Sequence, residues 1–355
     1  MRIAIDCRLI GQSGIGTFIE NIVRHAVDIP HTDYVLIGDK NILACYASKK
    51  NCMIIDCRHK SFTLKELFLF PTKEINQCDA FFTPNFNIPM GIKVPIFSTI
   101  HDVVFFDVKG FCTPFGKLIR WLYIKRALSI SKAVFTVSLF SKSRIESLFH
   151  PNCPILVCYS GISEELRQYV KDHSPIAPTE KKDNLVFLGN LKKNKGLHTL
   201  IPAYRTLLKN PENKTTLTII GNIDFRTKDK EIQNLINDND NRIIFLRGAS
   251  NEQVFKELAE AKALISPSEY EGLGLPPMEA MFLGTPAIIS DIPVYREIYG
   301  DTPVRFFKKG DVEDLARQLK DIPSFIPKIE KLVDGKHNFY HITTFIIKSI
   351  IHSKV

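Results

Sequence analysis

Residues 266–290 combine the carboxylates of Glu271 and Glu279 with bare backbone amides at the start of a helical pattern. The segment reads SPSEYEGLGLPPMEAMFLGTPAIIS: a strand pattern ends, a loop carries Glu271, and a proline pair opens a helix that Gly284 closes. Glu279 then falls in the first helical turn. An ionised carboxylate accepts two hydrogen bonds at once, so these two glutamates suit two sets of ligand hydroxyl groups.

The amides of this loop add a second binding capacity. Those of Gly272, Leu273, Gly274 and Leu275 precede the helix, where hydroxyl or phosphate oxygens are readily bound. A Glu-x7-Glu spacing alone carries little information, because a glutamate in a first helical turn also complements the helix dipole. The composition of the whole loop therefore favours ligand binding, with helix-end electrostatics as the structural alternative.

A lysine cluster follows another strand pattern in the second half of the chain. Residues 187–201 read FLGNLKKNKGLHTLI and contain Lys192, Lys193 and Lys195. Departure of a phosphate without a metal needs fixed cations where negative charge develops. The structural alternative is a group of solvated lysines at the start of a helix.

Two first-half turns also carry candidate residues. Gly14 and Gly16 lie in IGQSGIGTF, where glycine allows close approach of a phosphate or simply a tight strand-to-helix turn. His101 and Asp102 end the strand pattern PIFSTI. A lone histidine at a strand end is usually a satisfied structural group, so the residues alone leave its role open.

Strand and helix patterns alternate along the chain. Short β-branched or aromatic runs in the first half are RIAID, YVLIG, CMIID, AFFT, PIFSTI, AVFTVS and PILVC. The second half repeats the pattern with NLVFLG, LTIIG, IIFL, ALISP and PAIIS, separated by helical stretches such as NEQVFKELAEAK. This alternation predicts parallel βαβ units and an α/β protein with two doubly wound, Rossmann-like domains.

We place the domains at 1–165 and 184–335, joined by a polar, proline-bearing linker at 166–183. The last segment, 336–355, has helical spacing and no strand after it, so it could pack back on the first domain. Ligands of open α/β sheets bind outside the carboxyl ends of the strands. Two such edges across a cleft would suit an enzyme with two substrates.

The loop from Glu271 to Glu279 resembles the EX7E signature of retaining GT-B glycosyltransferases, usually written E-x-F-G-L-x-x-x-E. That family includes bacterial mannosyltransferases and the sucrose and glycogen synthases, and Leu273 stands where it usually has phenylalanine. The resemblance implies the GT-B fold, with the two Rossmann-like domains facing a central cleft. It further implies that Glu271 and the loop amides hold the donor sugar while Glu279 binds the nucleotide ribose.

The lysine cluster is similar to the family's G-R-L-x-x-x-K-G segment, in which an arginine and a lysine neutralise the diphosphate. Lys195 and Gly196 match that pattern. Asn190 occupies the arginine position, so Lys192 or Lys193 is the nearest source of the missing charge.

The family also has a glycine-rich loop where Gly14 and Gly16 lie, and an H-D pair where His101 and Asp102 lie. By this resemblance His101 would touch the donor sugar beside the reacting carbon and Asp102 would orient it. The resemblance extends from Met1 to about Leu319.

The expected function is that of a metal-independent, retaining hexosyltransferase without a cofactor. The interpretation we favour is mannose transfer from GDP-mannose to a lipid-linked or oligosaccharide acceptor in bacterial surface polysaccharide assembly, such as O-antigen, capsule or lipopolysaccharide. Donors based on UDP or dTDP stay open, as does a non-catalytic nucleotide-sugar-binding partner of another transferase. A nicotinamide-dependent oxidoreductase is disfavoured, because no full G-x-G-x-x-G follows either opening strand.

Bulk properties bear on partners and location. The net charge is +9, and residues 109–144 hold eight Lys or Arg residues and no acid, which indicates either a solvated face or an anionic membrane surface. No nucleic-acid partner is expected. The start, MRIAIDCRLIG, is too short and polar for a signal peptide, so we expect a cytoplasmic protein, at most peripheral to the inner face of the membrane. The eight cysteines include no C-x-x-C pair and are interpreted as buried thiols rather than metal ligands.

Overall fold

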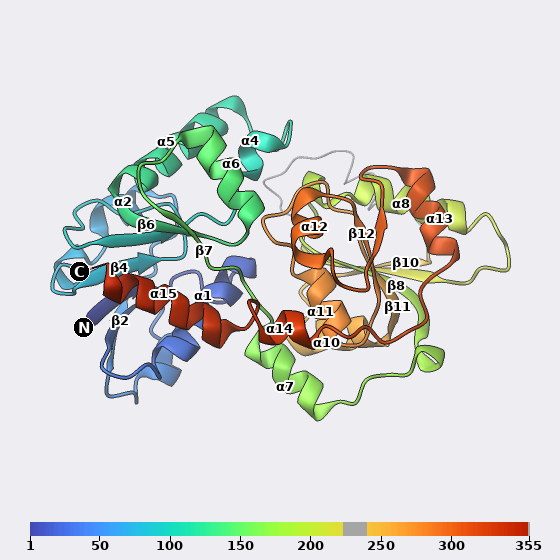
Figure 1. Ribbon diagram of the computed structural model, residues 1–355, viewed down its shortest axis with the longest axis horizontal. Coiled ribbons are helices and arrows are strands. Elements are labelled where there is room, and N and C mark those ends of the chain that lie inside the picture. Colours follow the sequence, from blue (N-terminus) through green and yellow to red (C-terminus); the bar gives the residue numbers. More distant parts are fainter. Residues whose placement is uncertain (223–239, 354–355) are drawn as a thin grey trace. The chain divides into compact units, whose positions relative to one another are not determined.

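The computed structural model describes residues 1–222 and 240–353. The chain divides into two compact units, and in Figure 1 the first of them runs from blue to green and also contains the dark red C-terminal helix. Unit 1 comprises Met1–Ser163 and Gly335–Val355, and unit 2 comprises Glu164–Asp334. The chain therefore leaves unit 1 once and returns to it for its last segment.

Unit 1 alternates strands with helices, as the sequence patterns predict. Its elements are β1 (Arg2–Asp6), α1 (Ser13–Ala26), β2 (Asp33–Gly38), the 3-10 helix η1 (Leu43–Tyr46), β3 (Cys52–Asp56), α2 (Leu64–Leu69), α3 (Thr72–Ile75), β4 (Ala80–Thr83), β5 (Ile96–Thr99), α4 (Val104–Asp107), α5 (Pro114–Ile130), β6 (Ser131–Thr136), α6 (Leu139–Phe149), β7 (Ile155–Val157) and the final α15 (Phe339–His352).

The unit 1 sheet has seven parallel strands in the order β3-β2-β1-β4-β5-β6-β7. Strand β1 lies between β2 and β4, with Ile3 opposite Tyr34 on one side and Ala80 on the other. The chain order reverses between β1 and β4, and ligands of doubly wound sheets bind at such a switch point.

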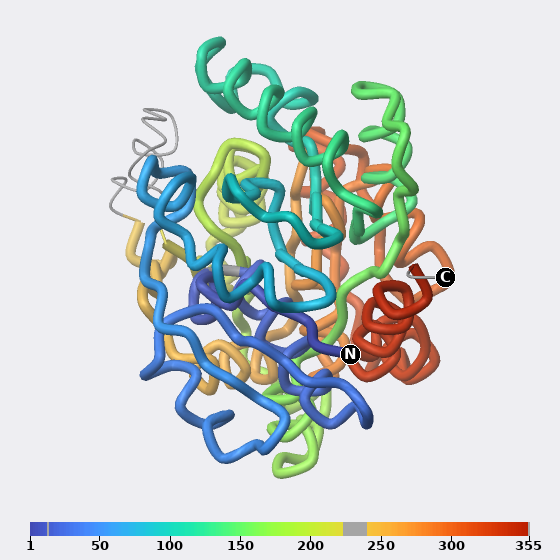
Figure 2. The backbone as a smooth tube through the Cα atoms, turned by 90° about the vertical axis from the view of Figure 1, so that its left-hand side faces the viewer, coloured from blue at the N-terminus to red at the C-terminus, as the bar shows by residue number. Residues whose placement is uncertain are grey.

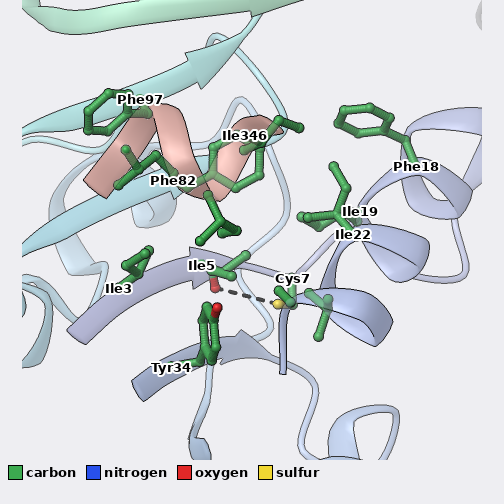
Figure 3. Packing of buried hydrophobic residues seen from close by; sticks show 14 of the residues in the cluster. Ile3, Ile5, Cys7, Phe18, Ile19, Ile22, Tyr34, Phe82, Phe97 and Ile346 are labelled. Atoms are coloured by element: carbon green, nitrogen blue, oxygen red, sulfur yellow. Dashed lines mark hydrogen bonds between the residues drawn. The ribbon is translucent and has the colours of Figure 1, made fainter. Parts of the chain in front are cut away.

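Two layers of helices cover this sheet. One face packs against α1 and α15, and Figure 3 shows Ile22 of α1 and Ile346 of α15 in the same cluster as Ile3 and Ile5 of β1. Figure 2 shows the red α15 beside the blue N-terminal part of the chain. The other face packs against α3, α5 and α6. Alternate residues of each strand enter the two layers, which is why the strands read as nearly continuous apolar runs.

Unit 2 repeats the arrangement with six parallel strands in the order β10-β9-β8-β11-β12-β13. Its switch point lies between β8 and β11. Its described elements are α7 (Glu164–Asp172), η2 (Pro178–Glu180), β8 (Lys182–Leu188), η3 (Lys193–Lys195), α8 (Leu197–Leu207), β9 (Thr216–Ile220), β10 (Ile243–Leu246), α10 (Asn251–Glu260), β11 (Ala261–Ser266), α11 (Pro276–Phe282), β12 (Ala287–Ser290), α12 (Pro293–Tyr299), β13 (Arg305–Phe307), α13 (Val312–Lys320) and α14 (Glu330–Asp334).

The expected α/β class with two Rossmann-like domains is confirmed, and each predicted strand is present. The segment 166–183, expected as a linker, instead begins within helix α7, which belongs to unit 2. Leu166, Tyr169 and Val170 of α7 follow helical spacing, although only Leu166 is fully buried. Gly284 ends α11 with a left-handed φ of 79°, as its sequence position predicts.

The cysteines depart in part from expectation. All eight are free thiols and four are buried, but Cys45 is exposed and three others are partly exposed. Among the described residues, no helix is long and apolar enough to cross a membrane.

Candidate functional site

The switch point of unit 2 brings together the two loops that carry most of the expected donor-binding residues. One loop follows β8 and the other follows β11, and these strands are neighbours. A Cβ atom on Gly196 would lie 1.9 Å from the carbonyl oxygen of Pro267, so glycine is needed for the loops to approach this closely. Asn194, which is buried, donates from Nδ2 to the Tyr270 carbonyl at 3.0 Å, and its backbone carbonyl accepts from the Glu269 backbone amide at 2.8 Å.

Lys195 and Glu271 are in direct contact across these loops. Lys195 Nζ lies 2.6 Å from Glu271 Oε1, and Ser268 Oγ donates to the same oxygen at 2.7 Å. Glu271 is 8% exposed, so its charge is held at the base of the loop. Its Oε2 has no partner among the described residues and is the oxygen available to a ligand hydroxyl.

Glu279 has a different environment. It lies in the first turn of α11, is partly buried, and its carboxyl group has no hydrogen-bond partner among the described residues. Burial raises its pKa to about 7, because the charged form loses hydration without gaining a cation. A ligand diol that donates two hydrogen bonds would restore the preference for the ionised form.

Packing fixes the loop between these two glutamates. Gly274 has a φ of 81°, and a Cβ atom there would lie 2.4 Å from the Tyr295 ring. The Tyr295 hydroxyl pairs with Ser266 Oγ at 2.7 Å, and the Tyr299 hydroxyl donates to the Gly274 carbonyl. Gly272 and Leu273 are buried, and Leu275 precedes α11. Tyr295 and Tyr299 of α12 therefore hold the loop in place, and the sequence alone did not predict this contact.

The remaining residues of the lysine segment differ in exposure. Asn190 is exposed just after β8, Lys192 is partly buried and Lys193 is exposed. Of this cluster, Lys195 is the cation that contacts a candidate carboxylate. The structure therefore brings Lys195, Glu271 and the loop amides together. Asn190, which is uncharged, lies exposed at the carboxyl end of β8.

In unit 1 the two glycines have different surroundings. A Cβ atom at Gly16 would lie 2.3 Å from the Leu9 carbonyl oxygen, so packing alone requires glycine there. A Cβ atom at Gly14 would meet nothing within 4 Å. Of the two, Gly14 therefore has the open space that a ligand would need.

His101 is held in one orientation at the end of β5. Its ring packs edge-on against Phe18 of α1, with 5.0 Å between centroids, and Nε2 lies 2.9 Å from the Pro84 carbonyl oxygen. Burial lowers the pKa of His101 to about 4, against the opposing effect of the Pro84 hydrogen bond, so the ring is neutral near pH 7. Because a carbonyl only accepts, Nε2 carries the proton and Nδ1 is left as an acceptor. Asp102 accepts from the Val104 amide at 3.1 Å.

A buried charged cluster at the unit 1 switch point was missed by sequence reasoning. Arg8 donates to Asp6 Oδ2 and to Glu66 Oε1, both at 2.7 Å, and to the His59 carbonyl at 3.0 Å. Asn87 donates to the same Glu66 oxygen. The only available signal was the pair of charged residues, Asp6 and Arg8, at the end of an apolar strand. The cluster ties the segment before α2 to the end of β1.

Comparison with known proteins decides the family of the second unit. Residues 170–324 match the family model for glycosyl transferases group 1. This part of the chain is a glycosyl transferases group 1 domain. It contains both loops of the unit 2 site, with Lys195, Glu271 and Glu279.

Two O-antigen mannosyltransferases are similar to part of this chain. O-antigen chain mannosyltransferase B of Escherichia coli is 27% identical over 237 residues, which cover 61% of this chain and 58% of that protein. O-antigen chain mannosyltransferase RfbU of Salmonella typhimurium is 27% identical over 248 residues, covering 68% and 62%. The matched parts thus span about three fifths of the length of these curated relatives.

The fold is shared with Anabaena HepE, whose structure contains UDP and glucose. The TM-score is 0.70 at 15% identity, covering 99% of this chain and all of that one. This likeness confirms the expected GT-B fold class for a chain with a group 1 domain.

Proposed function

We propose that this protein is a retaining, metal-independent hexosyltransferase that takes mannose from GDP-mannose to a lipid-linked or saccharide acceptor in bacterial surface polysaccharide assembly. The single observation that carries the proposal is the Lys195–Glu271 contact at the switch point of the group 1 domain. Glu271 would accept hydrogen bonds from sugar hydroxyls, and Lys195 would supply a positive charge for a diphosphate. Both lie at the sheet edge where doubly wound sheets bind ligands.

The proposed reaction is a single transfer. The acceptor hydroxyl oxygen forms a bond to the anomeric carbon as the bond from that carbon to the diphosphate oxygen breaks. The acceptor proton passes to the departing phosphate oxygen on the same face, so the products are a glycoside and a nucleoside diphosphate. Lys195 and the amides of residues 272–275 would stabilise the charge that develops on the diphosphate. No carboxylate nucleophile is required, in contrast to a retaining hydrolase.

In unit 1, His101 presents a neutral acceptor at Nδ1, which suits a sugar hydroxyl better than it suits a phosphate. We assign His101 and Asp102 to the sugar and Gly14 to the approach of the diphosphate. Glu279 would take the ribose hydroxyls.

Support for mannose comes from the two O-antigen mannosyltransferases, which are distant relatives. HepE binds UDP and glucose in its structure, and this favours a UDP-sugar donor as the second candidate. The two candidates share the diphosphate and the hexose and differ in the base, so donor binding separates them.

A nucleotide-sugar screen by thermal unfolding tests the proposal, because a ligand that binds only the folded state raises the melting temperature. We expect stabilisation by GDP-mannose that is lost in Glu271→Gln, and release of GDP when an acceptor is added. Glu269→Gln is the matched control, since Glu269 lies in the same loop and pairs with His198 at 2.7 Å.

Three results would contradict parts of the proposal. Stabilisation without nucleoside diphosphate release with any acceptor would indicate a binding protein. An inverted anomeric carbon in the product would remove the retaining mechanism. Loss of turnover in EDTA that is restored by a divalent cation would remove metal independence.

A further inference from the structure

The most exposed apolar side chains of the protein gather on two helices of unit 1. Among large hydrophobic residues in 1–222 and 240–353, the four highest exposed fractions are 76, 72, 65 and 62%, for Leu64, Phe115, Phe68 and Leu69. Leu118 and Leu122 are each 53% exposed. Residues 115, 118 and 122 are spaced by three and four, so they share one face of α5. Scattered exposed leucines are normal, but a cluster of six marks an interaction site.

Backbone and ring contacts tie α2 to the C-terminal half of α5. The Met90 amide donates to the Leu67 carbonyl of α2 at 2.9 Å, while Arg126 of α5 donates to the Pro89 carbonyl at 3.3 Å. The Phe62 ring, just before α2, packs against Tyr123 of α5 with 5.5 Å between centroids. We use the name α2–α5 face for Leu64, Phe68, Leu69, Phe115, Leu118 and Leu122.

The border of this face is cationic. Residues 57–72 contain one acid, Glu66, which is buried and bound to Arg8, whereas Lys60 and Lys65 are exposed. Residues 108–145 contain no acid, and Lys117 and Lys125 on α5 are exposed. An apolar centre with a border of one sign of charge fits an apolar partner whose surface is anionic.

The residues that could contact a membrane differ in part from those expected in the stretch 109–144. Arg144 is bound to Asp107 through two hydrogen bonds of 2.6 and 2.9 Å, and Arg126 is committed to backbone carbonyls. Trp121 is partly buried with Lys125 over its ring at 4.6 Å. Half of the apolar contribution, that of Leu64, Phe68 and Leu69, therefore comes from α2, which lies outside that stretch.

We propose that the α2–α5 face docks unit 1 onto an anionic lipid bilayer. The apolar side chains would enter the boundary between headgroups and acyl chains, and the bordering lysines would meet the headgroups. A second copy of this chain is the poorer occupant, because a face-to-face dimer would bring the same lysines against each other. Nucleic acid offers no place for six exposed apolar side chains. The proposal is independent of the donor that unit 2 takes.

The expected strength of membrane binding has an electrostatic contribution from the lysines and an apolar contribution from the exposed side chains. Each lysine near an anionic surface improves partitioning about fivefold, and this gain disappears at high salt. Replacing two leucines and two phenylalanines by serine removes most of the apolar term, so the partition coefficient should fall more than about a hundredfold.

Vesicle flotation without donor or acceptor tests the proposal. The full chain is mixed with vesicles of phosphatidylcholine alone, or of phosphatidylcholine with about one third phosphatidylglycerol. We expect flotation with the anionic vesicles only, and its loss in Leu64→Ser/Phe68→Ser/Phe115→Ser/Leu122→Ser. The control variant is Ile42→Ser/Tyr340→Ser, which alters side chains that are 48 and 58% exposed elsewhere on unit 1. A Lys65→Gln/Lys117→Gln/Lys125→Gln variant should weaken flotation and its salt dependence.

The alternatives have different outcomes. Equal flotation on both vesicle types, or flotation of the fourfold serine variant that matches the wild type, would overturn the proposal. So would a wild-type dimer in sedimentation velocity that becomes a monomer in the serine variant, because the face would then belong to a second copy. Thermal unfolding of each variant shows whether a loss of flotation comes from misfolding. Transferase activity on a soluble acceptor is expected to persist in the serine variant.

Discussion

The sharpest test of the donor site is the pH dependence of donor binding and its loss in Glu279→Gln. The Glu279 carboxyl has a pKa of about 7 in the free protein, because burial disfavours its charge. A ribose diol donates hydrogen bonds and therefore selects the ionised form. Binding and deprotonation are linked, so donor affinity should rise with pH up to about 7 and level off above it.

The magnitude follows from the ionised fraction. At pH 6 about one molecule in eleven would be ionised, so affinity should fall about tenfold from its alkaline limit, which is about 1.4 kcal/mol. Glutamine keeps one acceptor oxygen but no charge. At pH 8 the variant should bind more weakly by roughly 1.5 to 3 kcal/mol, the value of hydrogen bonds to an ionised acceptor. The two affinities should approach each other near pH 6, where the wild type is mostly protonated.

Isothermal titration with an intact nucleotide sugar is the suitable assay, because its diphosphate is a diester and lacks the monoester group that titrates near pH 6. A flat wild-type affinity between pH 5.5 and 8, or an unchanged slope in Glu279→Gln, would refute the reasoning.

Four further outcomes are expected. Lys195→Met should weaken donor binding by roughly 1.5 to 3 kcal/mol, measured by titration calorimetry. His101→Ala should lower kcat by more than threefold, and by more than it lowers donor affinity, in steady-state assays. Gly274→Ala should destabilise unit 2 by roughly 2 to 4 kcal/mol in urea unfolding, because φ is 81° and the Tyr295 ring is 2.4 Å from the new atom. His337 is fully buried, and burial lowers its pKa to about 4. Between pH 6.5 and 4 the unfolded chain therefore binds a proton at this histidine that the folded protein does not bind. The free energy of unfolding should fall by up to about 3 kcal/mol over this range, and by less in His337→Asn.

The strands of both units could be predicted because parallel, doubly covered strands are short apolar runs between polar turns. Elements without that signature were missed. Strand β13 fully buries only Phe307, and α7 fully buries only Leu166. The helix α15 was predicted because its isoleucines repeat at helical spacing, and they pack into the unit 1 core.

The candidate site was predictable in its residue types but not in its contacts. Lys195 and Glu271 are 76 residues apart, and nothing local in the sequence shows that they touch. Gly14 and Gly16 look alike in sequence, yet a backbone carbonyl packs against one and open space lies beside the other. Contacts of this kind depend on how strands order themselves in a sheet, which local spacing does not encode.

The charge balance of the unit 2 loops explains why Lys195 is bound to Glu271 before any ligand arrives. A carboxylate that is 8% exposed would be strongly destabilised if it were ionised without a partner, so Lys195 and Ser268 both stabilise its Oε1 atom. A diphosphate that binds here must therefore share a lysine whose charge is already partly neutralised. Because the residue at 190 is asparagine, no arginine at that position adds a second fixed cation. Removal of the Lys195 charge should therefore cost this protein more donor affinity than the same change would cost a relative that keeps an arginine there.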